Sequence, residues 1–278
     1  MNEIEIKLRS RAKTLLESGE VARVIGWIAT RVPGKTRPAV ITAPEDAEKL
    51  VWNEHCVNST AKYLMAYRYE DGKSAVCARG CDARAINRLV SDKQLERSKI
   101  YILGIPCPGL DNAACSRCGH RNPVVSDELL GQPVAEVKPQ GRFSGIEELE
   151  KKPLEYRQSF WEDVFTKCIR CYACRNACPA CSCRECYADQ YRVGWQGKQF
   201  NSAENRVYGL TRAYHVGDRC IECGECERVC PMELPIMLQT GKMLRDINDI
   251  YGEYECGLSD SEHPALGVYD LGDADEFN

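Results

Sequence analysis

Two cysteine runs in the C-terminal half of the chain repeat one spacing and both end in proline. They are Cys168-x2-Cys171-x2-Cys174-x3-Cys178-Pro179 and Cys220-x2-Cys223-x2-Cys226-x3-Cys230-Pro231. Gaps of two residues let three thiolates of one run surround a 4Fe–4S cube, while the fourth cysteine binds the other cube. The alternative is a pair of zinc sites, but zinc ribbons rarely repeat this spacing with proline in both halves. The spacing therefore favours two 4Fe–4S clusters.

This crossed arrangement predicts four cysteine ligands for each cluster. The first set is Cys168, Cys171, Cys174 and Cys230, and the second set is Cys178, Cys220, Cys223 and Cys226. Pro179 and Pro231 suit positions where the chain must turn away from a cube. Both clusters therefore depend on both runs.

The composition of the 278 residues narrows the class of protein. The net charge is −4 with both signs mixed, which does not indicate binding to nucleic acid or to an anionic membrane. No apolar run is long enough to span a bilayer, and the charged segment 1–11 does not resemble a signal peptide. Regular cysteine spacing in a chain that is not secreted indicates thiolates rather than disulfides. We therefore expect a cytoplasmic protein of anaerobic metabolism.

The elements that must position further cysteines lie in the N-terminal half. We predict helices at 1–20, 56–65 and 82–90, with Asp82 as an N-cap, and strands at 21–29, 39–42, 74–78 and 99–105. Alternation of this kind predicts an α/β domain with a mostly parallel sheet. The carboxyl ends of parallel strands meet at one edge, where ligands bind.

Four cysteines follow these strand ends. Cys81 comes just after strand 74–78, Cys107 follows strand 99–105, and Cys115 and Cys118 come shortly afterwards. Thiols from three loops can therefore meet at one edge of the sheet. The alternative is a zinc site in which Cys115 and Cys118 are joined by Cys107 and by Cys81 or His120.

Short motifs in the same region carry a family resemblance. They are Gly104-Ile-Pro-Cys107, Cys115-Ser-Arg-Cys118 and Ser126-Asp-Glu-Leu-Leu-Gly131, with looser matches at 56–64 and 79–86. They resemble the β-subunits of coenzyme F420-reducing hydrogenases and their formate dehydrogenase relatives, over about residues 20–135. The resemblance implies that Cys107, Cys115 and Cys118 bind a third 4Fe–4S cluster, with Cys81 as our candidate for its fourth ligand.

A flavin stays an open alternative. Many members of this family carry a flavin that reduces a deazaflavin coenzyme. This chain is shorter than those members, its ferredoxin part is C-terminal, and it has neither a Gly-x-Gly-x-x-Gly fingerprint nor a P-loop.

Three more cysteines, Cys181, Cys183 and Cys186, directly follow the first run. Setting aside the eight ligands of the two runs and two isolated cysteines leaves eight of the eighteen, the number that two further cubes require. We therefore expect three clusters and keep a fourth as an alternative. One residue of this set could also replace Cys81, or all three could simply pack near the cubes.

The long segment between the two runs resembles the helical spacer of α-helical ferredoxins, which occur in succinate dehydrogenase and heterodisulfide-reductase-type subunits. The closest match runs from Arg212 to Cys226, and Pro235 is expected to begin a helix that ends near residue 250. We therefore predict an α/β domain followed by a mainly α-helical two-cluster ferredoxin domain. The predicted boundaries are 1–135, a linker at 136–155, the ferredoxin domain at 156–256 and an acidic tail at 257–278.

These observations predict an iron–sulfur electron-transfer subunit of a multi-subunit oxidoreductase. Its clusters would pass single electrons between two partners. One is a catalytic subunit of the formate dehydrogenase, hydrogenase or similar tungsten or molybdenum type, and the other is a flavin or heterodisulfide-reductase-like module. No Ser/His/Asp set or paired carboxylates indicate a catalytic site in this chain. The alternative is a flavin enzyme that reduces a deazaflavin or nicotinamide cofactor and receives its electrons from the clusters.

Overall fold

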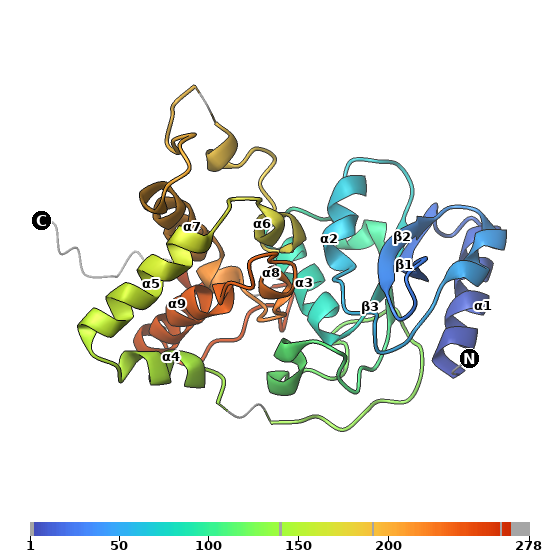
Figure 1. Cartoon of the computed structure of the whole chain (residues 1–278). Helices are drawn as coiled ribbons and strands as arrows, with labels where there is room; N and C mark the ends of the chain where they lie inside the picture. Colours follow the sequence, from blue (N-terminus) through green and yellow to red (C-terminus); the bar gives the residue numbers. More distant parts are fainter. Residues whose placement is uncertain (1–2, 139–140, 191, 262, 268–278) are drawn as a thin grey trace, which may run out of the picture.

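The computed structural model describes residues 3–138, 141–190, 192–261 and 263–267. An α/β unit built from the N-terminal part of the chain lies beside a helical unit built from the C-terminal part (Figure 1). This arrangement confirms the predicted fold class, an α/β domain followed by a mainly helical region.

Five strands form one sheet in the order β2-β1-β3-β4-β5. They are β1 (Arg23–Ala29), β2 (Thr36–Ile41), β3 (Ser74–Ala78), β4 (Ile100–Gly104) and β5 (Glu128–Leu129). Strands β1, β3, β4 and β5 run parallel, and β2 pairs antiparallel with β1 at the edge. All of β3 is buried, as expected for a strand covered on both faces.

Successive residues of the strands point to opposite faces of the sheet. Val24 belongs to the apolar core beneath helix α1 (Glu3–Glu17), whereas Ile25 belongs to the core beneath α3 (Gly80–Ser91). The short helix α2 (Ala61–Leu64) joins the second core. The sheet is therefore a rigid central layer, and its parallel strands all deliver their carboxyl ends to one edge.

The helical unit surrounds the two cysteine runs. Its helices are α4 (Ser144–Glu150), α5 (Leu154–Lys167), α6 (Ala173–Ala177), α7 (Ser202–Val216), α8 (Glu225–Arg228) and α9 (Ile236–Tyr251). Helix α7 packs against both α5 and α9, and α6 packs against α8. Within the described residues, no helix is long and apolar enough to cross a membrane.

Short 3-10 helices connect these elements. They are Pro44–Lys49, Met65–Tyr67, Arg97–Lys99, Ala113–Arg117, Tyr187–Asp189, Gly217–Arg219 and Ala265–Gly267.

The segment before α2 differs from the predicted helix over 56–65, because residues 56–60 are not helical. The Arg79 guanidinium donates hydrogen bonds to the carbonyl oxygens of Cys56, Val57 and Asn58 at 2.7, 3.0 and 3.0 Å. These carbonyls would otherwise accept bonds from the next helical turn. A tertiary contact therefore overrides the local helix propensity.

Arg79 and Asp82 form an ion pair at the start of α3. The Arg79 Nε donates to Asp82 Oδ2 at 2.6 Å, and both side chains are almost completely buried. The Asp82 carboxylate also accepts the backbone N–H groups of Thr60 and Arg79. Asp82 thus stabilises the first turn from inside the helix, at its third residue, rather than as the predicted N-cap.

Helix α4 lies in the segment predicted as a linker. Its buried Ile146 lies against Gly241 of α9, and its Glu150 forms ion pairs with Lys242 and Arg245 of the same helix. A helix of seven residues is too short to be stable alone, so these contacts stabilise it. The sequence pattern of the segment did not reveal it because the stabilising partners are distant in sequence.

The α/β and helical units are in tight contact. Arg84 Nε and Asn87 Nδ2 of α3 donate to the carbonyl oxygens of Cys256 and Gly257 at 2.9 and 3.1 Å. A Cβ atom at Gly257 would lie 2.2 Å from the Arg84 carbonyl oxygen. The segment predicted as an acidic tail thus begins packed against α3.

We predict that Asp82→Asn strongly destabilises the protein, because it leaves the buried Arg79 charge without a counter-ion. The expected loss is about 3–5 kcal/mol in the free energy of unfolding, measured by anaerobic denaturant titration. The matched control is Asp163→Asn, which breaks an exposed ion pair with Lys167 and should cost less than about 1 kcal/mol. Equal losses in the two variants would contradict the importance of the buried pair.

Candidate iron–sulfur centres

The first predicted ligand set meets at one cavity. Cys168, Cys171, Cys174 and Cys230 all line it. The end of α5 contributes Phe165, and α7 contributes Tyr208 and Arg212. Three sulfurs thus come from the first run and the fourth comes from the second run. The Tyr208 hydroxyl lies 3.8 Å from Cys174 Sγ.

The second predicted set meets at a neighbouring cavity. Cys178, Cys220, Cys223 and Cys226 line it, together with apolar groups such as Val216 and Met237. Here the crossing is reversed, since three sulfurs belong to the second run and one to the first. The arrangement of the eight sulfurs fits two cubes that share their two runs.

The two runs have the same backbone conformation. Arg170 and Tyr172 of the first run have positive φ values of 45° and 60°, and the equivalent Glu222 and Gly224 have 60° and 73°. Left-handed turns are costly for residues other than glycine, so their repetition indicates a shared constraint. They wrap the backbone around the cavities.

Backbone N–H groups point at cysteine sulfurs in these turns. The Glu222 N–H donates to Cys220 Sγ at 3.4 Å, and the Leu234 N–H donates to Cys230 Sγ at 3.5 Å. Hydrogen bonds of this kind stabilise cluster thiolates and raise the reduction potential. The chain therefore offers both cysteine sulfurs as cluster ligands and backbone N–H groups that donate hydrogen bonds to those sulfurs.

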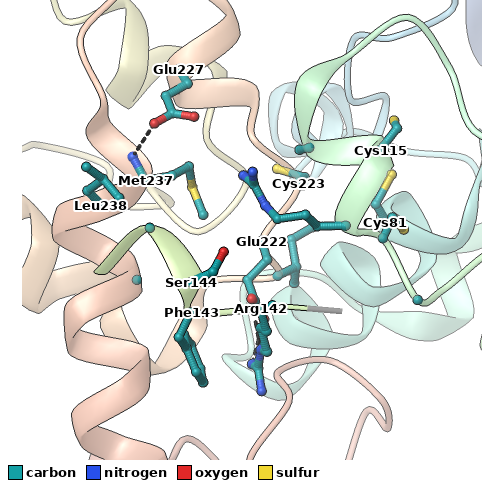
Figure 2. A pocket seen from close by; sticks show the side chains of 18 of the residues that line it. Cys81, Cys115, Arg142, Phe143, Ser144, Glu222, Cys223, Glu227, Met237 and Leu238 are labelled. Carbon is teal, nitrogen blue, oxygen red and sulfur yellow. Dashed lines mark hydrogen bonds and ion pairs between the residues drawn. The ribbon is translucent and has the colours of Figure 1, made fainter. Parts of the chain in front are cut away.

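A third group of cysteines meets at the edge of the sheet. Cys81 in the first turn of α3 and Cys115 and Cys118 of the following loop line a cavity of about 340 Å³ (Figure 2). Cys107, after β4, lies beside them: burial raises the pKa of its thiol, and the Cys115 and Cys118 sulfurs raise it further. Cys223 of the second run also lines this cavity and lies near Cys81 (Figure 2).

Burial raises the pKa of many of these thiols. The effect is large for Cys81, Cys220 and Cys223, and burial also raises the pKa of Cys226, to about 12. Thiols in such places keep their protons unless a positive centre replaces them. Metal binding therefore has to release protons and is coupled to folding.

The remaining three cysteines have separate surroundings. A hydrogen bond from the Cys181 thiol lowers the pKa of Cys178. Cys183 is exposed beside Tyr69 and Arg184, and Cys186 lies near Arg175. The structure thus places Cys181 beside Cys178, leaves Cys183 exposed and keeps Cys186 partly buried.

The cysteines surround cavities instead of converging on a point. Among the described residues, no three His, Cys, Asp or Glu side chains come close enough together to hold a single metal ion. His120, the alternative zinc ligand, has its Nε2 2.5 Å from the Glu255 carboxylate of the helical unit. The hydrogen bond from His120 lowers the pKa of Glu255 to about 2.

Buried arginines near the cavities escaped the sequence analysis. Arg84 lines the third cavity, and its Nη2 has no hydrogen-bond partner. Arg212 has an unpartnered Nε and lines both other cavities. A cube with four thiolate ligands is anionic, so these guanidinium groups fit its presence. The spacing of Arg84 three residues after Cys81, on the same helix face, was the available signal.

The comparisons with known proteins agree with this geometry. A family model described as a 4Fe-4S dicluster domain matches residues 164–234, which contain both cysteine runs. The chain therefore has a C-terminal dicluster domain that binds 4Fe–4S clusters, and it falls in the class of iron–sulfur electron-transfer proteins.

The relatives agree with the N-terminal motifs. The chain is 22% identical to the F420-dependent formate dehydrogenase subunit beta of Methanocaldococcus jannaschii, over 83% of this chain and 86% of that protein. It is 23% identical to the F420-dependent formate dehydrogenase 1 subunit beta of Methanococcus maripaludis, over 83% and 84%. These matches confirm the predicted resemblance to formate dehydrogenase β-subunits and the prediction of an iron–sulfur electron-transfer subunit.

Among solved structures, a chain of the F420-reducing [NiFe] hydrogenase complex from Methanosarcina barkeri is 20% identical, with a TM-score of 0.31 over 38% of both chains. This partial likeness adds no argument about the fold or the site.

We predict that Gly224→Ala weakens the contact between the second cysteine run and the third cysteine group. A Cβ atom there would lie 2.5 Å from the Cβ of Ala114, and φ is +73°. Gly19→Ala is the matched control, since its φ is +70° but nothing lies within 4 Å. The control should cost about 1–2 kcal/mol from backbone strain. Gly224→Ala should cost about 1–3 kcal/mol more through overpacking.

Anaerobic unfolding titrations measure both values. A Gly224→Ala loss no larger than that of Gly19→Ala would show that the contact can relax without cost.

Proposed function

We propose that the chain is a three-cluster electron wire. The observation that carries this proposal is that the three cysteine-lined cavities form a series joined by shared walls. Cys223 lines both the third and the second cavity, and Arg212 lines both the second and the first. Cubes in cavities that share wall residues would be neighbours, and single electrons would pass along the series from one to the next.

In this proposal each cluster has four cysteine ligands. The sets are Cys168, Cys171, Cys174 and Cys230; Cys178, Cys220, Cys223 and Cys226; and Cys81, Cys107, Cys115 and Cys118. Residues 1–135 hold the third cluster and residues 156–256 hold the other two, connected by 136–155. Cys181 packs on the second cluster without binding it, and Cys183 and Cys186 are not ligands.

The partners follow from the relatives. Those proteins are β-subunits of F420-dependent formate dehydrogenases. We infer that this chain also works in a multi-subunit cytoplasmic oxidoreductase, between a formate dehydrogenase or hydrogenase-type catalytic subunit and a flavin or heterodisulfide-reductase-like module. The third cluster would exchange electrons at the α/β end and the first cluster at the helical end.

The chain itself contributes three features that would support the clusters. The left-handed turns hold sulfurs around each cavity, backbone N–H groups stabilise thiolates, and apolar walls such as Phe165 and Val216 keep water away. Bound clusters would supply the one-electron chemistry, with potentials set by burial, hydrogen bonds and nearby charge.

The first experiment is the metal and flavin content of anaerobically purified protein. The proposal requires about twelve irons and as many acid-labile sulfides per chain, at four per cube. About eight irons with one zinc would remove the third cluster, and about sixteen irons would require a fourth. One extracted flavin per chain would instead favour the enzyme that reduces a deazaflavin or nicotinamide cofactor.

Substitution of one ligand tests the separate third cluster. Cys118→Ala should lower the iron content from about twelve to about eight per chain and leave the two clusters of the dicluster domain intact in EPR spectra. The control Cys183→Ser changes an exposed cysteine and should keep all twelve. Loss of dicluster iron in Cys118→Ala would contradict the assignment, and iron loss in Cys183→Ser would make Cys183 a ligand.

A further inference from the structure

Arg212 occupies a position shared by two cluster sites. It belongs to the inner face of α7, and only 6% of its surface is exposed. Its side chain lines the cavity of Cys168, Cys171, Cys174 and Cys230, and it also lines the cavity of Cys178, Cys220, Cys223 and Cys226. The Arg212 side chain therefore lies between the two cysteine-lined cavities of the dicluster domain.

The guanidinium has few protein partners. Its Nη2 donates to the Cys174 carbonyl oxygen at 3.4 Å, and its Nε donates to nothing. Among the described residues, no carboxylate lies within ion-pair distance of it. Two other arginines differ, because the buried Arg79 pairs with Asp82 and the half-buried Arg228 pairs with Glu225.

An unpaired buried cation is costly, so the fold has to provide an anion near it. Burial lowers the pKa of Arg212, but the nearby sulfurs of Cys178, Cys226, Cys181 and Cys174 outweigh burial and raise the pKa. Cys178 and Cys226 belong to the second ligand set, and Cys174 belongs to the first. The negative charge close to Arg212 therefore comes from both cluster sites.

We propose that Arg212 is a positioning residue that compensates the negative charge of the first and second clusters at once and raises the reduction potential of both. The proposal rests on the ligand sets of the proposed function. Reduction adds one electron to a cube and neither forms nor breaks a bond, so the reduced cube is more negative by one charge. A fixed cation beside it stabilises that state more than the oxidised state.

One shared charge has a particular consequence. A cation close to both cubes shifts both potentials in the same direction, so it raises them without adding to the difference between them. Arginine suits this position because its charge is permanent and delocalised over a plane that can face two anions. The third cluster is farther away, since Arg212 does not line its cavity.

The test compares Arg212→Gln and Arg212→Lys with the control Arg206→Gln, which changes an exposed arginine of the same helix. Each full-length variant is purified anaerobically, its iron is counted, and its clusters are titrated with dithionite under EPR detection. We expect Arg212→Gln to lower the equilibrium constant for one-electron reduction of the first and second clusters about tenfold or more. This is equivalent to a reduction potential lower by about 59 mV for each cluster. Arg212→Lys should fall between Arg212→Gln and the native chain, and the third cluster should shift less.

Full iron with unchanged potentials in Arg212→Gln would overturn the proposal, as would a shift confined to one cluster. Loss of iron in both Arg212→Gln and Arg212→Lys would show that Arg212 is needed for folding, and this result would also overturn the proposal. The proposed function fails on a different result, namely a native chain with too few irons for three cubes.

Discussion

Burial of sulfur is the constraint on which the rest of this structure depends. Burial raises the pKa of thiols such as Cys81 and Cys220. Their ionised form becomes stable only beside positive charge. The buried guanidinium groups of Arg84 and Arg212 supply part of that charge, and the 4Fe–4S clusters of the dicluster domain supply more. The left-handed turns, the N–H donors and the apolar walls all serve to keep sulfurs in such places.

The sequence predicted which cysteines lie together better than it predicted the residues that surround them. The spacing of the two runs predicted which eight cysteines lie together, because ligand spacing is a local property. The edge formed by parallel strands predicted the meeting of Cys81 with Cys115 and Cys118. Those predictions depend on patterns within a few residues, or on the alternation of strands and helices in the sheet.

The features that the sequence did not predict share another physical origin. Residues 56–60 are not helical because Arg79, distant in sequence, binds their carbonyl groups. Helix α4 forms because α9 provides its ion pairs. Arg212 carried no signal of its own, since one arginine in an amphipathic helix usually faces solvent. Long-range contacts decide each of these cases, and a sequence pattern does not contain them.

The crossing of the two runs also bears on how the protein is made. Cys230 completes the site that Cys168 begins, and Cys178 completes the site that Cys220 begins. With the proposed ligand sets, neither cube can acquire all four sulfurs while the ribosome has synthesised only the first run. Maturation of both clusters would then wait until the chain beyond residue 230 has emerged.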